Sequence, residues 1–360
     1  MDKKTTPKIV RLTPPPKITK ENILGFGFGV RPYRVGGFRL DREDICGKSF
    51  YHNYGHGGGG VSLAPGCARR IVDKFLMEHK DKEREVAILG CGYMGLFQSI
   101  ILAELGFDVT IYAHIFPQKE GFYKDKSLLV SQVAGGFWMP FGCDFTSNRP
   151  LHDATTKESY QFYTDCIEKK LYKGLSYKDA VLIDYENPIL TAVPEGLMNW
   201  REVKVDFGNG VLHDAIIYRT ILIDGDTFLN ELMDEARQKG VKFVEREFVN
   251  LSDILTLKEK VIFNCMGGES RKFFKDDNLI PIAGHLIYVK KHPGVDYFLC
   301  SRTPDPAFQV TTYPQSNKLA IGLAYQKIGW ITEPNKQTLE TIMNNMNKWI
   351  DERAGPKPKL

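Results

Sequence analysis

Residues 86–113 contain the pattern that most constrains the fold of this chain. Residues 86–89 are apolar and predict a short strand, and residues 90–95 (GCGYMG) follow as a glycine-rich turn. Residues 97–105 then predict a helix, and residues 108–113 predict a second strand. A GxGxxG pattern alone is weak evidence. Placed between a strand and a helix that returns to a second strand, it predicts a dinucleotide-binding unit.

The individual positions of the turn agree with that interpretation. Gly90 and Gly92 would let backbone amides approach a pyrophosphate at the positive end of the helix. Gly95 would allow the helix to pack closely on the strand. Tyr93 and Met94 lie between these glycines, so the whole turn is a candidate cofactor contact.

The second strand of the unit ends at His114. A carboxylate usually stands at this place and binds the ribose hydroxyls of a dinucleotide. A histidine can also hydrogen-bond a ribose, so His114 is the candidate here. The remaining contacts to the adenosine end stay open.

Length and composition are those of an ordinary globular protein. The 360 residues are enough for two domains with substantial cores, and 42% hydrophobic and 26% charged residues are typical values. A net charge of +4 gives no argument for nucleic acid or an anionic membrane as a partner. Seven cysteines without CxxC or metal-ligand spacing predict reduced thiols and no metal site. No apolar run approaches the roughly 20 residues of a membrane span.

Four further segments, taken with the glycine turn, carry a resemblance to a known family. They are VRP at 30–32, RLDRE at 39–43, HNYGHGGGG at 52–60 and SQVAGGFWMP at 131–140. In this combination the chain resembles the D-amino-acid oxidase family, in which the glycine fingerprint comes first and the HNYGHGG block near the end. Here the order is reversed. The resemblance is therefore to a circularly permuted member, with the charged run at 79–85 bridging the old termini.

The resemblance implies an α/β fold in which a Rossmann-like FAD-binding domain is interleaved with a substrate domain built on a mixed or antiparallel sheet. Asp226 is the expected cap of a helix in the FAD-binding domain. The expected boundaries are an N-terminal arm at 1–25, a permuted FAD and substrate segment at 26–78, the FAD-binding domain at 86–185 and 220–278, the substrate domain at 186–219 and 279–335, and a C-terminal helix and tail at 336–360.

FAD is the cofactor that the resemblance implies. Consecutive glycines permit left-handed backbone and the close approach of a ligand, which suits the glycine-rich segments to this purpose. Covalent attachment of the flavin through Cys265 or His56 is left open. Besides the GxGxxG turn and His114, the residues implied to contact FAD are Gly57, Gly60, Val61, Ser62, Gly135, Gly136, Phe137, Phe248, Met266 and Gly267.

Three residues are implied to act on the substrate. Arg31 would hold a carboxylate through a bidentate pair of charge-assisted hydrogen bonds, and the carbonyl of Gly58 would accept a hydrogen bond from an amine. The ordinary oxidases carry two tyrosines in a YxxxYxxP stretch, and Ala307 and Thr311 stand at those positions before Pro314. Thr311 keeps a hydroxyl without the reach of a tyrosine, which predicts a larger or differently lined pocket.

The implied activity is oxidation of a D-amino acid to a 2-oxo acid, ammonia and hydrogen peroxide, with dioxygen as the acceptor. Two alternatives stay open: oxidation of another amine, and a flavin-holding protein without turnover. A small-molecule substrate and a homodimer are the expected partners. The N-terminus lacks the apolar core of a secretory signal, which predicts a cytoplasmic protein. The last three residues, PKL, leave a peroxisomal address as the alternative.

Overall fold

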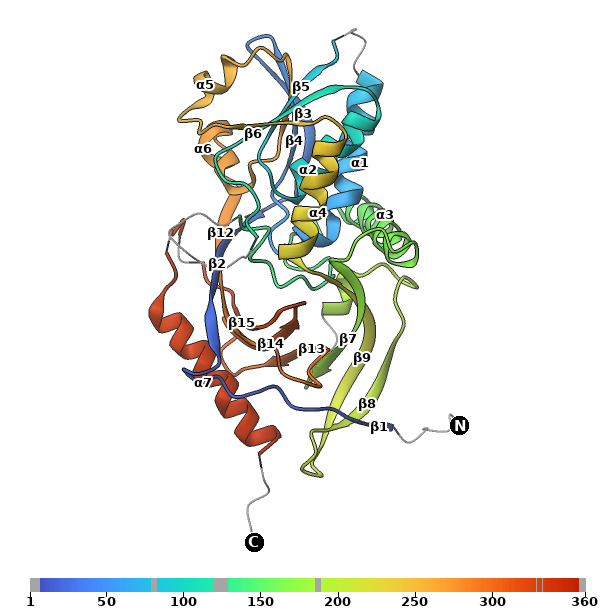
Figure 1. Cartoon of the computed structure of the whole chain (residues 1–360), viewed down its shortest axis with the longest axis vertical. Helices are drawn as coiled ribbons and strands as arrows, with labels where there is room; N and C mark the ends of the chain where they lie inside the picture. Colours follow the sequence, from blue (N-terminus) through green and yellow to red (C-terminus); the bar gives the residue numbers. More distant parts are fainter. Residues whose placement is uncertain are drawn as a thin grey trace.

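A computed structural model describes residues 7–78, 83–119, 129–184, 189–327, 329–331 and 333–355. Figure 1 shows a six-stranded sheet with its helices in the upper half of the molecule and a nine-stranded sheet with one long helix in the lower half. This architecture confirms the expected α/β class. The C-terminal PKL lies outside the described residues.

The six-stranded sheet has the strand order β10-β6-β5-β11-β4-β3. All neighbours are parallel except β3, which is antiparallel to β4. The glycine turn leaves the carboxyl end of β5, near the middle of this sheet. The strands are β3 (Arg39–Ile45), β4 (Lys48–Tyr54), β5 (Glu85–Leu89), β6 (Asp108–Ala113), β10 (Lys242–Glu245) and β11 (Val261–Asn264).

Helices cover both faces of this sheet, as a buried parallel sheet requires. Alternate residues of β5 point to opposite faces, so Val86 and Ile88 pack with one group of helices and Ala87 and Leu89 with another. The first group is α1 (Gly60–Glu78), α2 (Tyr93–Glu104) and α4 (Gly225–Gln238), with α3 (Arg149–Glu168) packed on α1. The second group is α5 (Leu251–Leu255) and α6 (Ser270–Phe274), which follows the short η2 (Gly267–Glu269).

The nine-stranded sheet has the order β1-β8-β9-β7-β13-β14-β15-β12-β2. Its lower face packs on α7 (Lys336–Arg353) through Ile342, Met346 and Trp349. Its opposite face carries Leu286 and Phe298, which pack with residues of the 131–140 segment. The strands are β1 (Lys8–Arg11), β2 (Ile23–Arg34), β7 (Leu175–Ile183), β8 (Trp200–Asp206), β9 (Leu212–Ile223), β12 (Leu279–Lys290), β13 (Phe298–Arg302), β14 (Phe308–Pro314) and β15 (Lys318–Ala324), with η1 (Ile189–Ala192) before β8.

The first 78 residues complete both sheets. β2 pairs antiparallel with β12 and forms one edge of the nine-stranded sheet, with Arg31 opposite Ile282. β4 pairs parallel with β11 in the six-stranded sheet. The N-terminal part of the chain is therefore built into the molecule and is not an appended unit.

Three details differ from the expected boundaries. β7 lies in the nine-stranded sheet, although residues up to 185 were assigned to the FAD-binding domain. β1, within the expected N-terminal arm at 1–25, pairs with β8 and forms the other edge of the nine-stranded sheet. The cap of α4 is Asp224, whose carboxylate accepts the Thr227 amide at 3.3 Å, and not Asp226. Two acidic residues stand two positions apart here, and the sequence could not distinguish which one caps the helix.

Asp226 instead joins the two halves of the molecule. It lies in the first turn of α4 and forms an ion pair with Lys318 of β15. Both side chains are buried, at 8% and 2% exposure. Gln132 donates a further hydrogen bond to Asp226 at 3.0 Å, so the pair also contacts the segment that carries Gly135 and Gly136.

Candidate active site and cofactor cavity

A cavity of about 650 Å³ is lined by residues of both sheets. The carboxyl ends of β4, β5, β6 and β11 line it from the six-stranded sheet, and β2, β7, β12, β13 and β14 line it from the other. Open α/β sheets bind their ligands outside the carboxyl ends of the strands. The cavity thus brings together the glycine turn, the HNYGHGGGG block and Arg31, which are distant in the sequence.

The glycine turn forms a backbone cradle. Gly90 has a φ of +102°, and a methyl group on Gly95 would lie 2.0 Å from the Gly90 carbonyl oxygen. Helix α2 can therefore begin directly on the turn only because both positions are glycine. Gly92 caps α2 in an extended conformation with no side-chain hydrogen bond. The first amides of α2 are then available to an anion.

Most of the sequence-predicted cofactor residues line this cavity. Gly95 and Ser62 do not. The Ser62 hydroxyl accepts a hydrogen bond from the Met139 amide at 2.9 Å, so Ser62 holds α1 against the 131–140 segment. The predicted residues that line the cavity are Gly57, Gly60, Val61, Gly90, Gly92, Tyr93, Met94, His114, Gly135, Gly136, Phe137, Phe248, Met266 and Gly267.

Two of these glycines also have a packing role. A methyl group on Gly135 would lie 2.6 Å from the ring of Tyr313, and one on Gly136 would lie 2.3 Å from the Ile223 carbonyl oxygen. Gly136 has a φ of +76°. The turn therefore needs glycine for its contacts with β14 and β9 as well as for any ligand.

Three buried side chains that line the cavity carry polar atoms with no hydrogen-bond partner among the described residues. These are both amide atoms of Asn53, Nε2 of His56 and the hydroxyl of Tyr93. Buried polar groups are normally hydrogen-bonded, so the unpaired atoms indicate a polar ligand in the cavity. The sequence does not single out Asn53, because nothing in the HNYGHGGGG block shows which of its side chains face the cavity.

A carboxylate lies beside the carboxyl end of β6, where the sequence itself has only His114. His114 is exposed at the end of β6. β10 runs parallel to β6 with Glu245 opposite Ala113, so Glu247 emerges at the same edge of the sheet. Glu247 and His114 both line the cavity, together with Phe248. The neighbouring strand thus supplies the acidic group that the end of β6 lacks.

Arg31 is the cation of the substrate side of the cavity. Its Cζ atom lies 4.5 Å from the centroid of the Tyr325 ring, and its Nη1 donates to the Ala324 carbonyl at 3.3 Å. Arg34 and Arg39 on the same segment pair with carboxylates. In the described part of the chain, no carboxylate lies within ion-pair distance of Arg31. The arginine therefore remains available to an anionic ligand.

The Gly57–Gly58 turn faces the strand that carries Arg31. The Gly57 amide donates to the Pro32 carbonyl at 2.9 Å, and the Gly58 amide donates to the Gly142 carbonyl at 2.8 Å. No described residue donates a hydrogen bond to the Gly58 carbonyl. This oxygen therefore has no donor among the described residues, and Gly58 lines the same cavity as Arg31.

Thr311 lines the cavity with its hydroxyl already engaged. β14 presents Gln309, Thr311 and Tyr313 to the cavity, and the Thr311 hydroxyl donates to the Gly322 carbonyl of β15. Thr311 therefore forms part of the wall. Two tyrosines that sequence analysis did not assign, Tyr313 and Tyr325, line the cavity as well.

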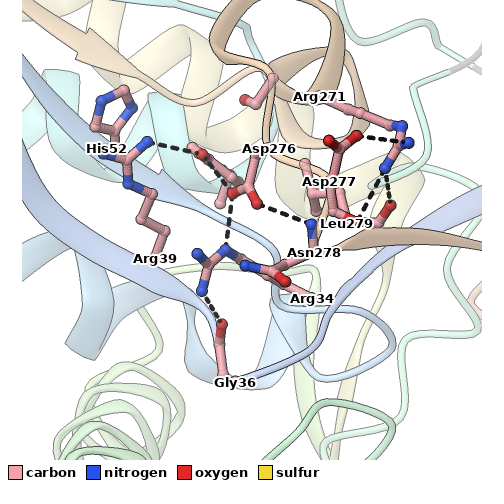
Figure 2. A network of polar contacts seen from close by, with 12 residues as sticks. Arg34, Gly36, Arg39, His52, Arg271, Asp276, Asp277, Asn278 and Leu279 are labelled. Atoms are coloured by element: carbon pink, nitrogen blue, oxygen red, sulfur yellow. Dashed lines mark hydrogen bonds and ion pairs between the residues drawn. The ribbon is translucent and has the colours of Figure 1, made fainter.

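A polar network fixes the ends of the strands that surround the cavity (Figure 2). Asp276, which precedes β12, accepts hydrogen bonds from Arg34 Nε and the Tyr54 hydroxyl, each at 2.8 Å. Arg39 donates to the same hydroxyl at 3.1 Å. Burial opposes ionisation of Asp276, but the hydrogen bonds from Arg34 and Tyr54 bring its pKa below the ordinary value. The network holds the Arg31 strand against the HNYGHGGGG block.

Buried histidines predict a loss of stability in mild acid. Burial lowers the pKa of His52 and of His56 to about 3, and burial together with Arg31 lowers the pKa of His285 to about 4. Below the ordinary value of 6.5, the unfolded chain binds protons that the folded chain does not. Each histidine should then reduce the free energy of unfolding by up to about 1.4 kcal/mol per pH unit, down to its folded pKa.

Urea denaturation between pH 7.5 and pH 5, with FAD in excess, measures this slope. The slope is proportional to the number of protons that the chain takes up on unfolding. His56→Phe should lower this number by about one, because it removes one group that titrates only in the unfolded chain. The matched control is Phe38→Leu, which changes the ring stacked on His56 without removing a titrating group and should keep the wild-type slope. Equal slopes for wild type and His56→Phe would contradict the assignment.

Part of the sequence matches the model of a known protein family. Residues 187–357 match the family described as FAD dependent oxidoreductase (DAO). Residues 187–357 thus carry the FAD-dependent oxidoreductase domain of this family. FAD is its cofactor, as expected from the sequence, and the cradle at Gly90 and the unpaired atoms of Asn53 and Tyr93 fit such a group.

Named relatives and solved structures agree with the family. A D-amino-acid oxidase from Streptomyces coelicolor is 24% identical over 281 residues, which cover 77% of this chain and 81% of the relative. Glycine oxidase from Bacillus cereus has a TM-score of 0.51 at 14% identity, over 73% of this chain and 77% of that chain. Iminodiacetate oxidase from Chelativorans sp. has a TM-score of 0.52 at 14% identity, over 75% and 79%. Within the described residues, no helix is long and apolar enough to cross a membrane.

Proposed function

We propose that the protein oxidises a D-amino acid with a single carboxylate and an apolar side chain to the corresponding 2-oxo acid. The observation that carries the proposal is Arg31, a cation without a carboxylate partner in the described residues, on the wall of a cavity that Gly58 also lines. The name of the Streptomyces coelicolor relative, D-amino-acid oxidase, supports the substrate class.

Each end of the substrate has a partner in this arrangement. Arg31 binds the carboxylate through two charge-assisted hydrogen bonds, and the Gly58 carbonyl accepts a hydrogen bond from the amine. These two contacts fix the α-carbon between them, which supplies orientation. Arg31 is the only charged residue among the described residues of the nine-stranded sheet that line the cavity. The side chain meets apolar groups: Phe137, Leu182, Leu286, Phe298 and Leu323.

The reaction balances with water and dioxygen. Held at the glycine turn of residues 90–95, FAD would supply the two-electron redox chemistry between the substrate and dioxygen. The oxidised substrate is an imine, which water hydrolyses to the 2-oxo acid and ammonia, while dioxygen becomes hydrogen peroxide. Arg31 and Gly58 contribute by holding the substrate in place, and neither residue gains or loses a proton overall.

A second candidate is oxidation of a different amine. The positions that carry tyrosines in ordinary oxidases hold Ala307 and Thr311, and the Thr311 hydroxyl is engaged with Gly322. Two fold neighbours are named glycine oxidase and iminodiacetate oxidase, and these names refer to small or N-substituted amines.

The proposal also includes the assembly and location of the protein. We propose a homodimer in the cytoplasm.

The arrangement of the sheets supports a circularly permuted chain. β2 and β4 pair with β12 and β11, so the N-terminal residues occupy places that a C-terminal segment would fill in the ordinary order. The proposal is tested by a rearranged gene in which residues 7–78 follow residue 355 through a short linker. A rearranged protein that folds and binds FAD supports the permutation, and one that does neither contradicts it.

Anaerobic spectroscopy tests the activity itself. The FAD-loaded protein is mixed with D-alanine, D-phenylalanine, D-aspartate, their L-isomers, glycine or sarcosine, and the visible flavin band is followed. The proposal expects bleaching by the apolar D-isomers that reverses when air is admitted, with formation of hydrogen peroxide. Bleaching by glycine or sarcosine alone would favour the second candidate. No bleaching by any of these compounds would overturn the proposed function.

A further inference from the structure

Tyr325 lies beside the two residues, Arg31 and Gly58, that the proposed function assigns to the substrate. The guanidinium of Arg31 lies over its ring, with Cζ 4.5 Å from the ring centroid. At the other end of the side chain, a methyl group added to Gly58 would lie 3.2 Å from the Tyr325 hydroxyl oxygen, and one added to Gly142 would lie at the same distance. One tyrosine side chain therefore spans the space between Arg31 and the Gly58 turn.

The backbone places Tyr325 firmly. β14 and β15 are antiparallel with Phe308 opposite Ala324, so Tyr325 lies opposite Ala307, and its amide donates to the Ala307 carbonyl at 2.8 Å. Opposite residues of such a pair have Cβ atoms roughly 4.5–5.5 Å apart. The small Ala307 side chain leaves the space beside it to the tyrosine ring.

The ring is a suitable support for a guanidinium. A planar arginine stacks on an aromatic face, which is attracted to the cation, and the stack limits the rotation of a long side chain. The glycine at 284 contributes from the other strand, since a methyl group there would lie 2.4 Å from the Arg31 guanidinium. Arg31 is thus held by Tyr325, by Gly284 of β12 and by its bond to Ala324.

We infer that Tyr325 is the positioning residue of the substrate site: its ring orients Arg31 for the carboxylate, and its hydroxyl fixes the distance from Arg31 to the Gly58 turn. The inference rests on the role proposed for Arg31. It concerns the binding of a carboxylate, so it can be tested without turnover.

Benzoate, a planar apolar carboxylate without an amine, is the probe. Its dissociation constant is measured from the change in the visible flavin spectrum of the FAD-loaded protein. Tyr325→Leu should raise this constant about 10-fold, because the arginine loses its stacked support. Tyr325→Phe keeps the ring and should change it less than about 3-fold. The matched control is Tyr297→Phe, which removes a hydroxyl that donates to the Thr13 carbonyl and does not line the cavity. FAD affinity, measured by fluorescence, should remain unchanged in all three variants.

A double-mutant cycle separates positioning from a merely structural effect. In an Arg31→Lys background, which keeps a charge and loses the planar group, Tyr325→Leu should weaken benzoate binding less than about 3-fold. An equal effect of Tyr325→Leu in both backgrounds would overturn the inference, and so would an unchanged dissociation constant in Tyr325→Leu. If Tyr325→Leu fails to fold, a 10-fold loss in Tyr325→Phe would overturn the role of the ring.

The outcomes also distinguish this inference from the proposed function. Benzoate binding that depends on Arg31 and Tyr325, together with a flavin that no D-amino acid reduces, would support the carboxylate site and reject the substrate. The KM for a reactive D-amino acid should rise in Tyr325→Phe with little change in benzoate binding, because the hydroxyl lies at the Gly58 end. An unchanged KM would contradict the role of the hydroxyl.

Discussion

Replacement of Arg31 by alanine should reduce kcat/KM for a D-amino acid by a factor of about 100 to 10,000. Each hydrogen bond to a charged group contributes about 1.5–3 kcal/mol, and a bidentate pair provides two of them. The sum of about 3–6 kcal/mol corresponds to this range, since each 1.4 kcal/mol is a factor of ten. The rate of anaerobic flavin reduction, measured by stopped flow over a range of substrate concentrations, provides the value.

The FAD affinity of Arg31→Ala should stay at the wild-type value, because the glycine cradle follows β5 of the six-stranded sheet whereas Arg31 is on β2 of the nine-stranded sheet. Arg31→Lys is the informative companion, since lysine keeps the charge and loses the bidentate geometry. Arg42→Ala is the matched control: this arginine lies on β3 and pairs with Asp44 and Glu78. Unchanged reduction kinetics in Arg31→Ala would remove Arg31 from the substrate site.

The second large effect concerns the ion pair between the two halves of the molecule. Asp226→Ala should lower the free energy of unfolding by about 3–5 kcal/mol, because it leaves the charge of Lys318 buried without its carboxylate. Lys318 is 2% exposed and lies over the ring of Tyr288. Urea denaturation at pH 7.5 measures the change.

Two comparisons make this result specific. The double variant Asp226→Ala/Lys318→Met should recover most of the lost stability, since an apolar pair often replaces a buried ion pair without loss. Glu85→Ala removes the partner of Lys258 in an exposed pair and should cost less than about 1 kcal/mol. A double variant no more stable than Asp226→Ala would show that the loss comes from something other than the unpaired charge.

Local pattern was enough to predict the nucleotide-binding half of the site. The strand, turn and helix at 85–104 follow from adjacent residues, because apolar runs and glycines determine them within one segment. Arg31 and the HNYGHGGGG block could be assigned for a similar reason, as each belongs to a continuous motif. The structure places them in one cavity through the pairing of β2 with β12 and β4 with β11.

The residues that escaped prediction depend on register between strands. Tyr325 reaches Arg31 because β14 and β15 pair with Phe308 opposite Ala324, and nothing in the sequence near 325 specifies that alignment. Glu247 reaches the end of β6 through the parallel pairing of β10 with β6. Asn53 lines the cavity because of the register in which β4 pairs with β11 and β3. Side chains contributed by a neighbouring strand have no local signal, so the sequence alone does not indicate them.

The pairing of early strands with late ones has a consequence for how this chain is made. β2 and β4 end by residue 54, whereas their partners β11 and β12 begin at residues 261 and 279. At 5–20 residues per second, a ribosome needs on the order of 10–40 s to make the intervening chain. During that time the aromatic strand that leads into HNYGHGGGG has no sheet partner from β11. Completion of both sheets therefore waits until β15 (Lys318–Ala324) has been made, and the nascent chain exposes apolar strand edges that chaperones recognise.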